Sequence, residues 1–165
     1  MPKKPSYIGL LNAIANGERG GHELFNAWSN STSDETLQPT LNMIAVREME
    51  HSWAFEKRLT ELGFSLRSAT NKSLGKHVKL LKSKATDEEK FASFGFGSKD
   101  DARSETADAL LQILSDKSID PQTGALMGRF ISEERDTGRV LTKAFRAMNA
   151  RNKKSSLPEP SRRDR

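Results

Sequence analysis

Apolar residues recur every three or four positions along several long segments of this 165-residue chain. Residues at that spacing lie on one face of an α-helix, so each segment predicts a helix with one buried face. The longest run comprises Leu37, Leu41, Ile44, Glu48, His51, Phe55, Leu59 and Leu62. No segment alternates apolar and polar residues as a half-buried strand does. The pattern therefore predicts an all-α protein.

Four helices are predicted, over residues 6–29, 39–62, 100–117 and 121–149. Gly63 is a typical residue after a helix end, and Asp120-Pro121 is a typical start. The first and last connections are short, whereas residues 64–99 form a long crossover with weaker helical patterns at 74–82 and from Asp87. This order predicts a four-helix bundle with one long crossover between helices two and three.

The length of the chain fits one domain. We assign residues 1–150 to the helical bundle and residues 151–165 to a tail. The tail contains two prolines, a pair of serines and several arginines and lysines, with little to bury except Leu157. This composition predicts a basic, disordered tail.

Composition excludes several classes of protein. The chain has no cysteine, which excludes disulfides and thiolate metal sites. No apolar run is long enough for a transmembrane helix, and the first residues do not have the pattern of a secretory signal. The sequence therefore predicts a cytoplasmic protein.

The net charge of +5 comes mostly from the two ends of the chain. A second basic block, residues 65–86, contains six lysines and arginines and no acidic residue. Such blocks can attract phosphate groups, but no aromatic residue is interleaved here and no nucleic-acid-binding motif is present. We interpret the block as a solvated face, and nucleic acid is not a predicted partner.

Five ionisable residues fall on, or at the edge of, the predicted apolar faces: Glu18, Glu48, His51, Glu133 and Asp136. A buried, unpaired carboxylate is costly, and several in one core repel one another. Divalent cations relieve both problems, and carboxylates with one imidazole suit iron or manganese, as one or two ions. The i, i+3 spacing of Glu48 and His51 places both side chains on one helical face. The pattern predicts a metal site, and a buried network of acids and arginines is the alternative.

Residues Gly17–Gly21, Arg47–Phe55 and Ile131–Asp136 resemble the rubrerythrin-type branch of the ferritin-like superfamily. The resemblance implies a ferritin-like four-helix bundle around a di-metal carboxylate site. It also implies roles for five residues: Glu18 as a terminal ligand, Glu48 as a bridge, His51 as a ligand to one metal, Glu133 as the second bridge, and Asp136 in place of the family's histidine. Without cysteine pairs, the chain has no rubredoxin module.

Two main readings of the function follow, and a third, iron storage, would need a cage-forming surface that one sequence does not show. The first is a di-metal oxidoreductase that acts on dioxygen or peroxide, and the second is a degenerate, non-catalytic bundle that serves as a binding or assembly module. Glu105 is the candidate ligand from the third helix, although its predicted direction lies away from the apolar face. His22 lies one turn from Glu18 and is expected to form an outer hydrogen bond rather than bind a metal. A homodimer is a possible assembly that the sequence neither requires nor excludes.

Overall fold

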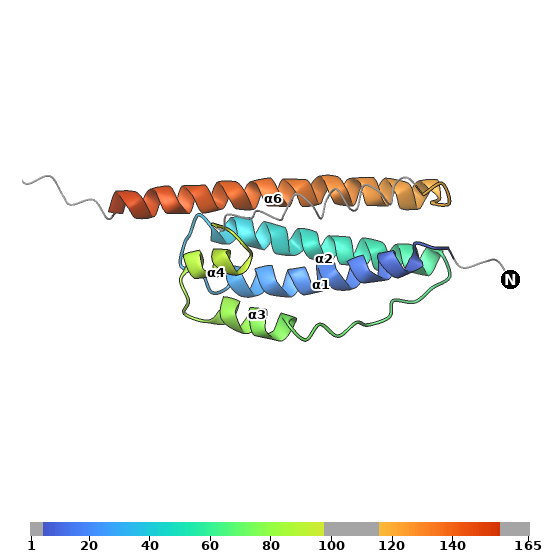
Figure 1. The fold of residues 1–165 in the computed structure, drawn as a ribbon, viewed down its shortest axis with the longest axis horizontal. Coiled ribbons are helices and arrows are strands. Elements are labelled where there is room, and N and C mark those ends of the chain that lie inside the picture. Colours follow the sequence, from blue (N-terminus) through green and yellow to red (C-terminus); the bar gives the residue numbers. More distant parts are fainter. Residues whose placement is uncertain (1–4, 98–115, 156–165) are drawn as a thin grey trace, which may run out of the picture.

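The computed structural model describes residues 5–97 and 116–155, and every regular element in those two ranges is an α-helix (Figure 1). The helices are α1 (Ile8–Ser29), α2 (Gln38–Glu61), α3 (Leu74–Lys82), α4 (Asp87–Ser93) and α6 (Pro121–Ser155). The prediction of an all-α chain is confirmed for these residues. The helix predicted over residues 100–117, with Glu105, lies almost wholly outside them. Among the described helices, none is long and apolar enough to cross a membrane.

Helices α1 and α2 form an antiparallel hairpin, and the predicted apolar face of α2 is its buried face. Every member of that run from Leu37 to Leu59 is buried, including Glu48 and His51. Gly63 follows the helix with a φ of +81°, a left-handed conformation that glycine adopts without strain. The spacing of apolar residues therefore predicted both the extent and the orientation of α2.

Helix α6 lies along α2, on the side away from α3 (Figure 1). At its start, Asp120 accepts hydrogen bonds from the Thr123 amide at 3.0 Å and the Tyr7 hydroxyl at 2.8 Å. Asp120 also forms an ion pair with Arg58 of α2 at 2.8 Å. Burial alone would raise the pKa of Asp120, but these hydrogen bonds outweigh it and lower the pKa well below its usual value. The predicted helix start at Asp120-Pro121 is thus confirmed, and it joins α6 to both α1 and α2.

The far end of α6 extends to Ser155, beyond the end predicted near Asn149. Arg151 forms an ion pair with Asp34, and Asn152 donates a hydrogen bond to Glu88 of α4 at 2.7 Å. These contacts give the last turns of the helix partners outside it. Residues 151–155, which we assigned to a disordered tail, are therefore helical.

Two apolar clusters lie at opposite ends of this helical assembly. One is built around Trp28, with Phe91 of α4 packed edge-on at 4.7 Å between ring centroids and Leu41 of α2 beside it. The other is built around Phe55 and Phe130, whose ring centroids are 5.2 Å apart. Glu18, Glu48 and His51 belong to neither cluster. The ionisable residues occupy a polar layer between the two clusters.

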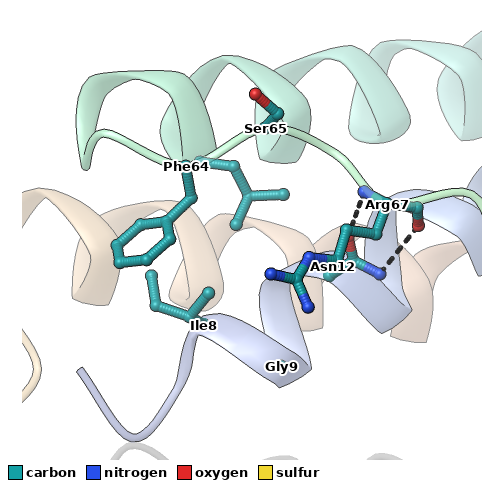
Figure 2. Close-up of a pocket in the computed structure, with 7 residues that line it drawn as sticks. Ile8, Gly9, Asn12, Phe64, Ser65 and Arg67 are labelled. Carbon is teal, nitrogen blue, oxygen red and sulfur yellow. Dashed lines mark hydrogen bonds between the residues drawn. The ribbon is translucent and has the colours of Figure 1, made fainter. Parts of the chain in front are cut away.

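The start of the crossover is tied to α1 by side-chain amides. Asn12 donates from Nδ2 to the Arg67 carbonyl at 3.0 Å and accepts from the Arg67 amide at 2.7 Å (Figure 2). Asn16 bonds in the same way to the Arg67 carbonyl and to the Ala69 amide. A shallow cavity beside this contact is lined by Ile8, Leu59 and Phe64. It contains no acidic residue and lies apart from the polar layer.

Candidate metal centre

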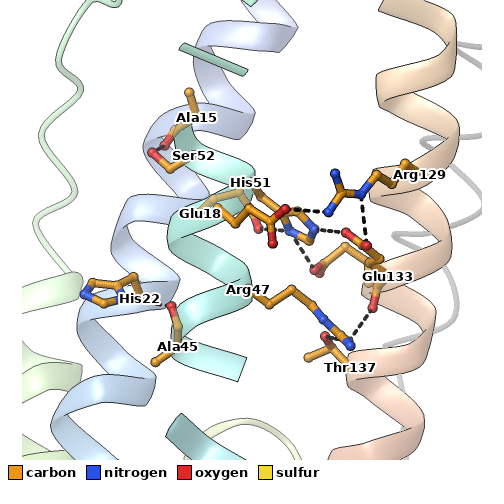
Figure 3. A network of polar contacts seen from close by, with 12 residues as sticks. Ala15, Glu18, His22, Ala45, Arg47, His51, Ser52, Arg129, Glu133 and Thr137 are labelled. Atoms are coloured by element: carbon orange, nitrogen blue, oxygen red, sulfur yellow. Dashed lines mark hydrogen bonds and ion pairs between the residues drawn. The ribbon is translucent and has the colours of Figure 1, made fainter. Parts of the chain in front are cut away.

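His51 is the centre of the polar layer, and its side chain is buried. Its Nδ1 lies 3.0 Å from Glu18 Oε2, and its Nε2 lies 2.6 Å from Glu133 Oε2 (Figure 3). Burial alone would lower the pKa of His51, but the hydrogen bonds to the two carboxylates outweigh it and raise the pKa above its usual value. One imidazole therefore joins α1, α2 and α6 through its two nitrogens.

Glu134 of α6 is the acid that sequence reasoning missed. Its Oε1 is buried and has no hydrogen-bond partner among the described residues. The same atom lies 3.8 Å from His51 Nδ1. Burial and the nearby charge of Glu18 raise the pKa of Glu134 to about 7. Glu18, His51 and Glu134 each offer a ligand atom, and these atoms lie within 4.8 Å of one another.

Glu48 borders this group from α2 and is only 6% exposed. Burial, reinforced by the charges of Glu18 and Glu134, raises the pKa of Glu48 well above its usual value. Its carboxyl group lies against Gly21 of α1, where an added Cβ would be 2.1 Å from Glu48 Oε2. A glycine inside α1 is thus explained by the space that the Glu48 carboxyl group occupies.

The two predicted ligands on α6, Glu133 and Asp136, have different partners from each other. Glu133 accepts hydrogen bonds from His51 and, at 3.0 Å, from Arg129 Nε. Asp136 forms ion pairs with Arg47 at 3.1 Å and Arg139 at 3.3 Å, and its side chain is 42% exposed. The structure therefore brings Glu133 to the outer side of His51 and does not bring Asp136 to the cluster, because Arg47 holds it at the edge.

The difference on α6 is one of helical phase. The predicted face of this helix contained Leu126, Phe130, Glu133, Asp136 or Thr137, Val140, Ala144 and Met148. Phe130, Thr137 and Met148 are buried as predicted, but Met127, Ile131 and Leu141 are also buried, whereas Leu126 and Val140 are only half-buried. Met127, Glu134, Leu141 and Met148 are spaced by seven residues, which is two helical turns. That heptad was a usable signal for Glu134. One step along a helix turns a side chain by about 100°, so a one-residue error exchanges an inward acid for an outer one.

His22 does not have its expected role beside Glu18. Its Nδ1 lies 2.7 Å from the carbonyl oxygen of Ala45, so its hydrogen bond ties α1 to the backbone of α2. Its ring therefore supports the hairpin, and the outer partner of His51 is Glu133 instead.

The donor set fits a divalent cation. Two ligand atoms bound to one ion at about 2.1 Å are at most about 4.2 Å apart, so the Glu18, His51 and Glu134 atoms need only a small closure. Carboxylates with a single imidazole suit iron or manganese. His51 Nδ1 faces the acids while Nε2 faces Glu133, and a metal-binding histidine usually donates its other N–H to such a carboxylate. Nδ1 is therefore the ligand atom that this geometry offers.

Comparison with protein-family models, curated proteins and solved structures finds no match to this chain. The resemblance to rubrerythrin-type proteins remains a prediction from the sequence motifs around Glu18, Glu48 and His51. The function has to be inferred from the chemistry of the polar layer itself.

Proposed function

We propose that this chain is a ferritin-like, metal-binding protein and that Glu18, Glu48, His51 and Glu134 hold one or two iron or manganese ions. The observation that carries this proposal is the buried Oε1 of Glu134, which has no hydrogen-bond partner among residues 5–97 and 116–155 and lies 3.8 Å from His51 Nδ1. A buried polar atom without a partner is costly, and a cation between Glu134, Glu18 and His51 would remove that cost. Bound iron or manganese would supply the redox chemistry of an oxidoreductase that acts on dioxygen or peroxide.

The chain's own residues prepare this site for an ion. The raised pKa values of Glu48 and Glu134 mean that both carboxyl groups give up protons when an ion binds. Glu133 orients the His51 ring by holding Nε2. The apolar clusters around Trp28 and Phe55 separate the layer from water at both ends of the bundle.

The complete bundle remains part of the proposal. Residues 100–117 would supply the fourth long helix and Glu105 would be its candidate ligand, as the sequence predicts. A cytoplasmic location and a small-molecule oxidant as substrate belong to the same proposal.

Three amide variants test the ligand assignment. Protein purified without chelator is analysed for metal content, and iron(II) and manganese(II) are then titrated into the metal-free form. We expect Glu134→Gln to abolish binding, and Glu133→Gln to weaken it about 10- to 100-fold because only the orientation of His51 is lost. Asp136→Asn is the matched control and should bind as the original protein does. If the original protein binds neither metal, the proposal fails.

A specific observation supports the non-catalytic alternative. His51 is already satisfied at both nitrogens, and Arg129 continues the network from Glu133 to Glu50 at 2.6 Å. A bundle with this network needs no ion for most of its buried polar groups. Under that reading, the chain serves as a binding or assembly module, and neither metal raises its melting temperature or gives it peroxide-reducing activity.

A further inference from the structure

The outward face of α2 carries exposed apolar side chains. Trp53 is 63% exposed, Val46 is 59% exposed and Met43 is 38% exposed, and these are the large hydrophobic residues that the described part of the chain leaves exposed. Val46 and Trp53 are seven residues apart and lie on one line along the helix. Tryptophan at a surface is typical of interaction sites, because a large ring gains much from burial.

Charged residues flank this line on one side. Met43, Glu50 and Lys57 are also spaced by seven residues, so they form a parallel line beside Val46 and Trp53. The side chains of Glu50 and Lys57 are 55% and 75% exposed. Glu50 already contacts Arg129, and Lys57 contacts Glu61 one turn away. Along the helix axis, the negative Glu50 therefore lies on one side of Trp53 and the positive Lys57 lies on the other.

We propose that this face of α2 binds the same face of a second copy of the chain, with the two α2 helices antiparallel. A two-fold axis perpendicular to the helices maps one flank onto the same flank of the other copy. With the axis next to Trp53, Glu50 lies opposite Lys57 of the partner subunit, and Lys57 lies opposite Glu50 of the partner subunit. The two exposed indole rings then meet at the centre.

Charge complementarity is the reason for choosing a second copy. An antiparallel pair of helices whose flanks carry opposite charges at symmetric positions is complementary to itself. An anionic membrane surface is a poorer fit, because the charges of Glu50 and Lys57 offset each other on this face and the exposed lysine cluster lies on α3. The surface is opposite the buried face of α2 that carries Glu48 and His51, so the dimer does not depend on metal binding.

The first experiment measures the oligomeric state of the full chain by light scattering and sedimentation. We expect the original protein to be a dimer and Trp53→Asp to be a monomer. Lys76→Glu, an exposed charge reversal on α3, is the control and should remain a dimer. Circular dichroism checks that each variant is folded. A monomeric original protein, or a Trp53→Asp variant that stays dimeric, overturns the proposal.

The second experiment tests the antiparallel arrangement. Glu50→Lys places two lysines opposite each other at both symmetric contacts, and Lys57→Glu places two glutamates there, so each variant alone should be a monomer. An equimolar mixture of the two variants restores opposite charges at both contacts and should form a heterodimer. Two folded, monomeric variants that fail to associate when mixed would rule out this arrangement of α2.

Discussion

At the scale of single residues, the polar layer combines carboxyl groups whose pKa values are shifted in opposite directions. Glu48 and Glu134 are buried beside other acids, which raises their pKa values. Burial alone would also raise the pKa of Glu133, but hydrogen bonds from His51 and Arg129 outweigh it and lower the pKa. At neutral pH the layer therefore contains a protonated Glu48 and an ionised Glu133, while Glu134 titrates near neutrality. This difference distinguishes the inward acids, which can bind an ion, from the acid that orients His51.

The raised pKa values predict how the stability of the metal-free protein depends on pH. A group whose pKa is higher in the folded state stabilises the fold at low pH, and this stability is lost as pH rises through the folded pKa. For Glu134, the change from 4.5 to about 7 corresponds to at most about 3 kcal/mol. Raising the pH from 5 to 8 should therefore lower the free energy of unfolding, and the raised pKa of His51 acts in the same direction.

Glu134→Gln isolates this effect because the amide cannot ionise. We expect the metal-free variant to match the original protein near pH 5 and to be more stable near pH 8, measured by urea unfolding with a chelator present. Glu35→Gln, at an exposed position in the α1–α2 connection, is the control and should follow the original protein. Equal pH dependence of Glu134→Gln and the original protein would contradict the burial of this carboxyl group.

Two glycines of α1 give a matched pair of substitutions. In the interior of a helix, alanine is favoured over glycine by about 1 kcal/mol. A Cβ at Gly17 meets no atom within 4 Å, so Gly17→Ala should stabilise the protein by up to that amount. A Cβ at Gly21 would lie 2.1 Å from Glu48 Oε2, so Gly21→Ala should stabilise less, or destabilise, and should weaken metal binding. Thermal unfolding and metal titration of both variants test this difference, and identical behaviour would contradict it.

At the scale of elements, sequence patterns predicted helices better than they predicted helical phase. The inward face of α2 carries the longest run of apolar residues at helical spacing, so Glu48 and His51 could be placed correctly even though Val46 and Trp53 lie exposed on the outward face. α6 has half-buried Leu126 and Val140 beside the buried Met127 and Leu141, and both sets of residues recur at helical spacing, so the sequence contains two possible registers. Tertiary contacts with Arg47 and His51 decide between these registers. Such contacts join residues more than 80 positions apart, and one helix's periodicity contains no information about them.

The start of α6 is the element whose disruption should be most costly. Asp120 caps the helix through the Thr123 amide and also binds Tyr7 and Arg58. We expect Asp120→Ala to lower the free energy of unfolding by about 3 kcal/mol, since it removes a cap and an ion-paired hydrogen bond. Asp120→Asn keeps one acceptor oxygen and should lose about 1 kcal/mol. Urea unfolding measures both, and equal losses would show that the charge of Asp120, rather than capping, determines the effect.

At the scale of the whole molecule, the described helices form a polar layer between two apolar clusters. The clusters around Trp28 and Phe55 hold α1, α2 and α6 in place, so the acids of the layer cannot move apart freely. This arrangement follows from sequence only in part. The positions of Glu18 and His51 near the middle of their helices were visible, whereas the direction of α6 depends on contacts at its two ends.

The contacts at the far end of α6 predict the effect of shortening the chain. Arg151 and Asn152 bind Asp34 and Glu88, which lie in the α1–α2 connection and in α4. Arg151 also helps to lower the pKa of Asp34, although burial alone would raise it. Ending the chain after Ala150 removes both contacts and should lower the free energy of unfolding by about 1 kcal/mol, because partly exposed ion pairs contribute little.

Ending the chain after Ser155 keeps these contacts and is the matched comparison. The removed residues, 156–165, have only Leu157 as a large apolar side chain, so their loss should leave the unfolding transition unchanged. Arg151→Ala in the full chain should reproduce part of the loss that follows truncation after Ala150. Differential scanning calorimetry of the three forms separates the two segments. A large drop in melting temperature on removal of residues 156–165 alone would mean that the basic tail, rather than the last turn of α6, secures this end of the molecule.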